Sequence, residues 1–124
     1  MAKLRHIAIS VPDLDASAAF FEKALGLEVG RHTAKRIHLS DRVMNLTLLP
    51  PDDLKGDPRE NFVGIHHLGF EVEDTAETTK TVEANCAKLV DTPANYVGEN
   101  ADLKYWDPNG VMFDILTTPW RVEK

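Results

Sequence analysis

The sequence is poor in cysteine, in long apolar runs and in positive charge, and each shortage excludes a class of protein. Its one cysteine, Cys86, cannot form a disulfide within the chain, so a cytoplasmic location is expected. No stretch approaches the roughly 20 apolar residues of a membrane helix, and Arg5 and His6 interrupt the start too early for a signal peptide. A formal net charge of −6, with no basic stripe, argues against nucleic acid as a partner.

What the chain does contain is an internal repeat. Residues 6–13 lie over residues 67–74 at an offset of 61, with histidine, valine and aspartate coinciding. Near the end of each copy, residues 45–50 lie over residues 114–119 at an offset of 69. Two matches in the same order, with a consistent insertion between them, indicate a duplicated module.

Each copy predicts one strand, one helix and three further strands. Residues 4–11 and 65–72 alternate between apolar and polar in the manner of strands. Asp13 and Asp74 fit helix N-caps, and Gly26 fits the left-handed end of the first helix. The second helix is expected to reach about Lys88. The remaining expected strands are 28–33, 35–41, 43–49, 89–92, 101–106 and 111–117.

The predicted fold class is therefore α+β, with two βαβββ modules forming a curved sheet. One domain is expected over residues 1–124. Module one takes about residues 1–50, the Pro-, Asp- and Gly-rich linker residues 51–64, and module two about residues 65–124.

Strand alternation brings three polar side chains to one face of the predicted sheet. His6 and His67 take the side away from the helix in their strands, and Asp114 does so between Phe113 and Ile115. Burying an unpaired carboxylate costs several kcal/mol, by order of magnitude, and a cation held with two imidazoles would compensate it. This donor set suits Fe(II), Mn(II), Ni(II), Co(II) or Zn(II), so the pattern predicts a divalent-metal site.

The alternative is that these histidines have a purely structural role as hydrogen-bonded core residues, as lone strand histidines usually do. The equivalent repeat positions of His6 and His67 favour ligands instead. His66 has the opposite parity and is interpreted as structural. His32 and His38 have no partner pattern and are interpreted as ordinary surface or sheet residues.

Three passages resemble the vicinal oxygen chelate superfamily, which includes glyoxalase I, methylmalonyl-CoA epimerase, extradiol dioxygenases and bleomycin resistance proteins. They are residues 4–27, residues 64–72, and the turn at 107–110 leading into Asp114. The resemblance implies a divalent metal held by His6, His67 and Asp114. It also places Asn45 where glyoxalase I has a glutamate, and the Asn45 amide oxygen is expected either to be a weak fourth ligand or to hydrogen-bond a metal-bound water.

The resemblance further implies an enzyme that binds two neighbouring oxygens of a small-molecule substrate to the metal. We expect a lyase or isomerase of the glyoxalase or epimerase kind, in which the metal stabilises an enolate. Glu71, which shares the parity of His67, is the candidate base. Tyr105 is the candidate for orienting the substrate or donating a proton.

Two alternatives stay open. An extradiol-type dioxygenase would use the same ligands, but its signature has a tyrosine where this chain has Lys104. A metal-free ligand-binding protein of the bleomycin-resistance kind would explain Asn45. A homodimer is expected because each module presents open strand edges. The sequence is compatible both with pairing of the two modules within one chain and with pairing between two chains.

Overall fold

The computed structural model describes residues 1–33, 35–54, 59–90 and 103–117. Each half of this described part follows the same order of one strand, one helix and three strands. The first half comprises β1 (Lys3–Ser10), α1 (Leu14–Leu25), β2 (Glu28–His32), β3 (Ile37–Ser40) and β4 (Asn45–Leu49). A short 3-10 helix, η1 (Pro51–Leu54), follows. The second half comprises β5 (Gly64–Glu71), α2 (Thr75–Ala84), β6 (Lys88–Leu89), β7 (Leu103–Trp106) and β8 (Met112–Leu116).

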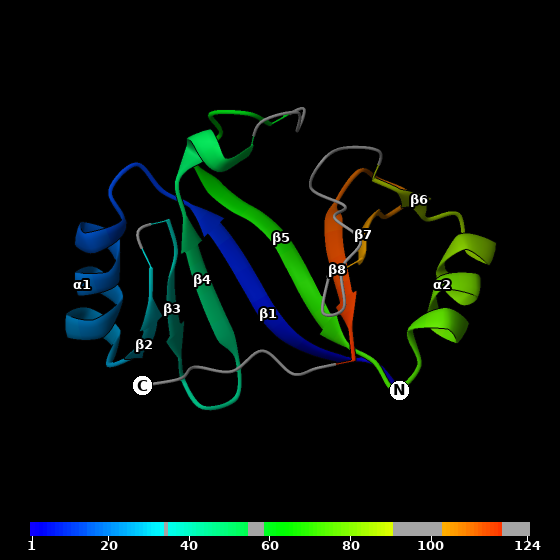
Figure 1. Cartoon of the computed structure of the whole chain (residues 1–124), viewed down its shortest axis with the longest axis horizontal. Helices are drawn as coiled ribbons and strands as arrows, with labels where there is room; N and C mark the ends of the chain where they lie inside the picture. Colours follow the sequence, from blue (N-terminus) through cyan, green and yellow to red (C-terminus); the bar gives the residue numbers. More distant parts are fainter. Residues whose placement is uncertain (34, 55–58, 91–102, 118–124) are drawn as a thin grey trace.

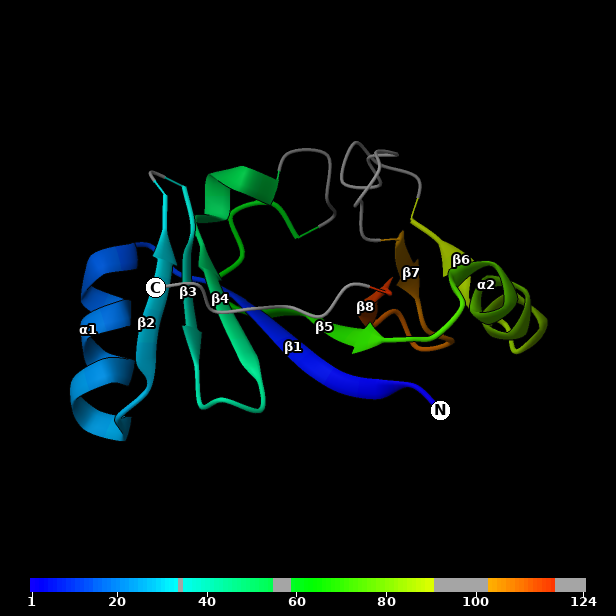
Figure 2. The same cartoon turned by 60° about the horizontal axis from the view of Figure 1, so that its bottom comes forward.

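The strands of the described part form one sheet in the order β2-β3-β4-β1-β5-β8-β7-β6. The first strands of the two halves, β1 and β5, pair antiparallel at its centre, so the modules pair within one chain. Each of them also pairs parallel with the last strand of its own half. The two helices lie at opposite ends of the curved sheet, α1 beside β2 and α2 beside β6 (Figures 1 and 2). The predicted α+β class is confirmed.

The helix boundaries follow from their caps. The carboxylate of Asp13 accepts a hydrogen bond from the Ala16 amide at 3.0 Å, and that of Asp74 from the Glu77 amide at 3.1 Å. Gly26 ends α1 at φ 73°, as predicted. The second helix is shorter than expected, because Cys86 adopts φ 74° and turns the chain out of the helix. Neither described helix is long and apolar enough to cross a membrane.

The strand alternation predicted from the sequence holds in both halves, except at His66 on β5. Leu39, Leu48 and Val11 pack with Ala18 of α1 in one core. Val72, Tyr105 and Ile115 form the second core, with Val82 of α2 against them. The opposite face of the central strands carries the polar residues His6, Ser10, Asn45, Thr47, His67 and Asp114, all buried.

The strand register differs from the repeat alignment in one respect. In the first half Ala8 lies opposite Thr47, and in the second half Gly69 lies opposite Asp114. Because Ala8 and Gly69 are equivalent at the offset of 61, Thr47 is the counterpart of Asp114, at an offset of 114 − 47 = 67. Asn45 instead lies directly beside His6. The sequence match at an offset of 69 is therefore displaced by two residues in space.

The strand β5 also departs from regular alternation, at His66. Ala8 pairs with His67 but Ile9 pairs with Ile65, so His66 is an extra residue in the ladder. Such a bulge disrupts alternation locally. Both His66 and His67 are buried as a result, although the sequence pattern predicted opposite faces for them.

Candidate metal centre

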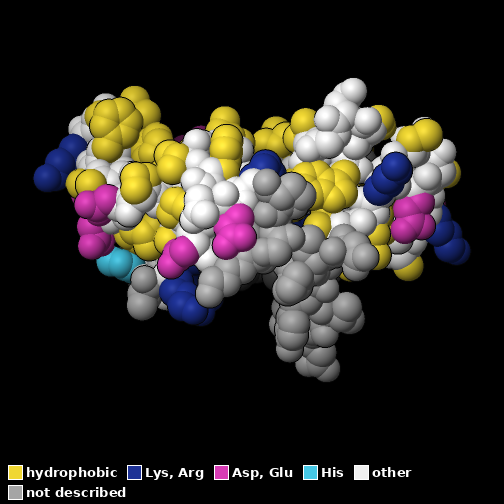
Figure 3. All heavy atoms as spheres, turned by 90° about the horizontal axis from the view of Figure 1, so that it is seen from above, with side chains coloured by type: hydrophobic (Ala, Val, Ile, Leu, Met, Phe, Trp, Pro, Cys, Tyr) yellow, Lys and Arg dark blue, Asp and Glu magenta, His cyan; other side chains and the backbone are white. Residues whose placement is uncertain are grey.

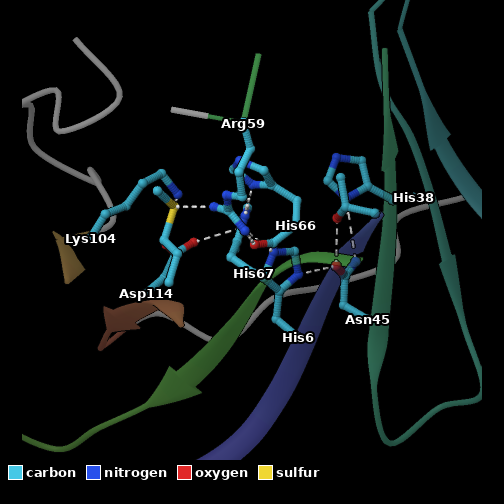
Figure 4. Close-up of polar contacts among 10 residues, drawn as sticks. His6, His38, Asn45, Arg59, His66, His67, Lys104 and Asp114 are labelled. Atoms are coloured by element: carbon cyan, nitrogen blue, oxygen red, sulfur yellow. Dashed lines mark hydrogen bonds and ion pairs between the residues drawn. The ribbon is translucent and has the colours of Figure 1, made fainter. Parts of the chain in front are cut away.

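Three side chains meet where the two halves join. His6 comes from β1, His67 from β5 and Asp114 from β8, and each offers one ligand atom within 4.8 Å of the others. His6 Nε2 lies 3.2 Å from His67 Nε2, which in turn lies 3.1 Å from Asp114 Oδ2. Two ligand atoms that each lie about 2.2 Å from a metal, with an angle of about 90° at the metal, are separated by about this distance. The structure thus brings together the three residues predicted as ligands (Figure 4).

Hydrogen bonds on the far side of each ring turn both imidazoles toward this point. His6 Nδ1 donates to Asn45 Oδ1 at 2.6 Å, because an amide oxygen can only accept. A neutral imidazole that donates from Nδ1 carries its lone pair on Nε2. His67 Nδ1 lies 2.6 Å from His66 Nδ1, which again leaves Nε2 of the ligand facing the centre. Such outer partners are what hold metal-ligating histidines in place.

Asp114 is fully buried, and its two oxygens have different surroundings. Oδ1 accepts a hydrogen bond from Lys104 Nζ at 2.7 Å. Oδ2 faces His67 Nε2 at 3.1 Å, and no group in the described part of the chain donates to it in regular hydrogen-bond geometry. An orphaned carboxylate oxygen beside two imidazole nitrogens is costly to bury, and a divalent cation removes that cost. The donor set and the orphaned oxygen therefore fit a metal ion.

The electrostatics keep the centre in its ligating form. Burial, together with the neighbouring His67, lowers the pKa of His6 from 6.5 to about 3. Burial also lowers the pKa of His67. Burial opposes ionisation of Asp114, but its contacts with His67 and with the ammonium of Lys104 outweigh this and hold its pKa below the usual value. Neutral imidazoles and an ionised carboxylate are the forms that bind metal.

Asn45 lies beside His6 rather than among the converging atoms. Its oxygen accepts from His6 Nδ1 and, at 2.7 Å, from the hydroxyl of Thr47. Nδ1 and Nε2 are on different edges of the ring, so Asn45 faces the edge of His6 that points away from His67. His38 continues this chain of polar contacts, with Nδ1 3.0 Å from Thr47 Oγ1. His38 was expected to have no role here and is half-buried in the polar network.

The two residues predicted as catalytic are not brought to the centre. Glu71 lies four residues along β5 from His67, a distance of about 13 Å, and its carboxylate is 3.8 Å from Arg5. Tyr105 is buried on the helix-facing side of the sheet, where its hydroxyl donates to Glu83 at 2.9 Å. Alternation along β7 sends Tyr105 to the face opposite its neighbour Lys104.

Three residues at the centre were not predicted from the sequence. Lys104 lies opposite Asp114 in the β7–β8 register, a relationship that strand pairing alone establishes. His66 reaches the centre only through the bulge on β5. Arg59 extends from the linker, donates to the His66 carbonyl, and lies 5.4 Å from the Trp106 ring. No signal in the sequence identifies Arg59.

Comparison with known proteins agrees with this geometry. Residues 3–115 match the family model described as the Glyoxalase/Bleomycin resistance protein/Dioxygenase superfamily. The chain is 37% identical over 86 residues to an ethylmalonyl-CoA/methylmalonyl-CoA epimerase of Cereibacter sphaeroides, a match that covers 60% of this chain and 63% of the relative. It therefore spans less than two thirds of that relative's length. It is 26% identical over 130 residues to a mitochondrial methylmalonyl-CoA epimerase of Dictyostelium discoideum, with 93% and 78% covered.

A solved structure of the same kind of protein shares the fold. The methylmalonyl-CoA epimerase from Mycobacterium tuberculosis superposes with a TM-score of 0.68 at 20% identity, covering 95% of this chain and 88% of that one. At this identity the likeness is one of fold alone.

Proposed function

Because the chain belongs to the glyoxalase, bleomycin resistance protein and dioxygenase superfamily, we propose that it is a divalent-metal-dependent isomerase that moves a proton next to a carbonyl group. The observation that carries the proposal is the convergence of His6 Nε2, His67 Nε2 and the orphaned Asp114 Oδ2. The relatives named as epimerases of methylmalonyl-CoA support the isomerase over the lyase.

The metal would be held by His6, His67 and Asp114, a set that suits Fe(II), Mn(II), Ni(II), Co(II) or Zn(II). When bound, it would act as a Lewis acid and stabilise negative charge developing on a substrate oxygen. Three protein ligands leave room for two oxygens of one substrate. The proposed substrate is accordingly a small acyl thioester with a carboxylate near the thioester carbonyl, as in methylmalonyl-CoA.

The protein itself holds the ligand side chains in position and keeps water away from them. Asn45 and His66 hold the two ligand imidazoles by their Nδ1 atoms, so neither ring has to reorient during the reaction. The ligands are at most 6% exposed, which strengthens every charge interaction at the centre. We place the protein in the cytoplasm as part of this proposal.

Proton exchange at the carbon between the two carbonyl groups tests the proposal directly. One enantiomer of methylmalonyl-CoA, incubated in D₂O with metal-loaded protein, should take up one deuterium and lose its optical purity. The His67→Ala variant and protein stripped by a chelator should both lose this exchange, and restoring the metal should rescue only the stripped wild type. Exchange at the wild-type rate in stripped protein would contradict the metal-dependent reaction.

One observation favours a second candidate, a metal-free ligand-binding protein of the bleomycin-resistance kind. Lys104 already gives the buried Asp114 carboxylate a cationic partner at 2.7 Å. Elemental analysis of protein purified without added metal distinguishes the candidates. About one divalent metal per chain supports the isomerase, and a metal-free protein that still binds a small ligand supports the alternative.

A further inference from the structure

The carboxylate at the candidate metal centre forms a nearly buried ion pair. Lys104 Nζ is 2.7 Å from Asp114 Oδ1, and the two side chains are 15% and 0% exposed. The pair is fixed by the sheet, because Lys104 and Asp114 are directly opposite each other in the β7–β8 register. The strand register therefore holds the backbone of Lys104 directly beside that of Asp114.

This ion pair changes the charge of the centre. Two neutral imidazoles and one carboxylate give a divalent metal site a net charge of about +1. With the ammonium of Lys104 included, the net charge becomes about +2. In a buried site of low dielectric such charges act strongly on a bound ligand.

We propose that Lys104 sets the substrate specificity of the centre, by selecting anionic oxygen ligands over neutral ones. The inference rests on the proposed metal site and assigns to Lys104 the preference for a substrate with a free carboxylate. The acyl group of a malonyl-type thioester carries one negative charge, on its free carboxylate. The ammonium of Lys104 favours the binding of this carboxylate at the centre.

The same ion pair has a second consequence, which separates it from a purely structural role. Lys104 withdraws negative charge from Asp114, the only anionic ligand in the described centre, and so weakens metal binding. Removing the ammonium should therefore increase the affinity for the metal and decrease the affinity for the anion. A residue needed only for folding would weaken both together.

The experiment measures the binding of Co(II) to metal-stripped protein, and of malonate and neutral malonamide to the Co(II)-loaded protein, by calorimetry. Lys104→Gln keeps a hydrogen-bond donor for Asp114 but removes the charge. Lys104→Arg keeps the charge. Lys80→Gln, an exposed lysine on α2, controls for the overall charge of the chain.

In Lys104→Gln we expect malonate to bind about 10-fold more weakly, which corresponds to about 1.4 kcal/mol, and Co(II) to bind more tightly. Malonamide should change by less than about threefold on the same scale. Lys104→Arg and Lys80→Gln should resemble the wild type.

Unchanged malonate affinity in Lys104→Gln, or equal losses for malonate, malonamide and Co(II), would overturn the inference while leaving the metal site intact. A wild-type chain that binds no Co(II) would instead overturn the proposed function itself, and this inference with it.

Discussion

His6 Nε2 lies 3.2 Å from His67 Nε2, although 61 residues separate the two histidines in the sequence. They occupy the same position in two copies of one module, and the antiparallel pairing of β1 with β5 brings these positions together. Neither half of the chain holds the complete cluster, because His6 comes from one half while His67 and Asp114 come from the other. The candidate centre is thus a property of the junction between modules.

Removing one imidazole should remove most of the bound metal. For His67→Ala we predict that Co(II) or Zn(II) affinity falls by at least about 100-fold, since one of three protein ligands is lost. Calorimetric titration of metal-stripped protein measures this. His32→Ala, a change at an exposed histidine of β2, is the matched control and should bind as the wild type does. Wild-type affinity in His67→Ala would show that His67 is not a ligand.

Asn45 should increase the affinity for the metal by orienting His6, without being a ligand itself. We predict that Asn45→Leu weakens Co(II) binding by about 10- to 100-fold, because His6 loses the acceptor for its Nδ1–H. Asn45→Asp should bind at least as tightly as the wild type, because a carboxylate is a stronger acceptor. The visible spectrum of bound Co(II) reports its ligands, and its shape should be the same in Asn45→Leu as in the wild type. A clear change of shape would mean that Asn45 is itself a ligand.

The metal-stripped protein should lose stability in mild acid. The pKa of His6 is about 3 in the folded chain and 6.5 ordinarily, so between these values only the unfolded chain binds the proton. Stability is therefore unaffected by this group above pH 6.5 and falls as the pH drops below it, by up to about 1.4 kcal/mol per pH unit. Urea unfolding at pH 7, 6 and 5 measures the slope, and His6→Gln should reduce it. The same slope in wild type and variant would contradict the buried neutral state of His6.

Replacing Tyr105 should lower the free energy of unfolding and leave metal binding and proton exchange unchanged. Tyr105→Phe removes the hydrogen bond to Glu83 on the helix-facing side and should cost about 1 kcal/mol of unfolding free energy. Metal affinity should change by less than about twofold. Deuterium exchange into methylmalonyl-CoA should continue at the wild-type rate. Loss of exchange with normal folding and metal content would restore the catalytic role predicted from the sequence.

The homodimer expected from the open strand edges stays a prediction. In the described part of the chain, β2 and β6 end the sheet. Several large apolar side chains are also exposed, among them Phe62, Val63 and Ile65 near the start of β5. Figure 3 shows apolar side chains at several places on the face that it presents. Sedimentation at micromolar concentration should give a dimer mass, and a monomer mass would contradict the prediction.

The sequence predicted the parts of the structure that depend on local periodicity. Alternation along single strands correctly separated His6 from its apolar neighbours and Asp114 from Ile115, since a strand has two faces whatever it pairs with. The caps Asp13 and Asp74 were equally local. These features were enough to identify both the repeat and the three clustered side chains.

Features that depend on how strands pair could not be predicted this way. The bulge at His66 adds one residue to β5 and brings a second histidine to the centre. The two-residue difference in register places Asn45 beside His6 rather than at the counterpart of Asp114. The ion pair between Lys104 and Asp114 exists only because β7 and β8 align as they do. None of these relationships is contained in the pattern of a single segment.

The antiparallel pairing of β1 with β5 also has a kinetic consequence. The strands that form the centre of the sheet are joined through contacts between distant parts of the chain, and such topologies fold slowly. A cation that needs ligands from both halves can bind only after the halves have met. Metal should therefore leave the refolding rate nearly unchanged and slow unfolding, so that the loaded protein persists longer under denaturing stress.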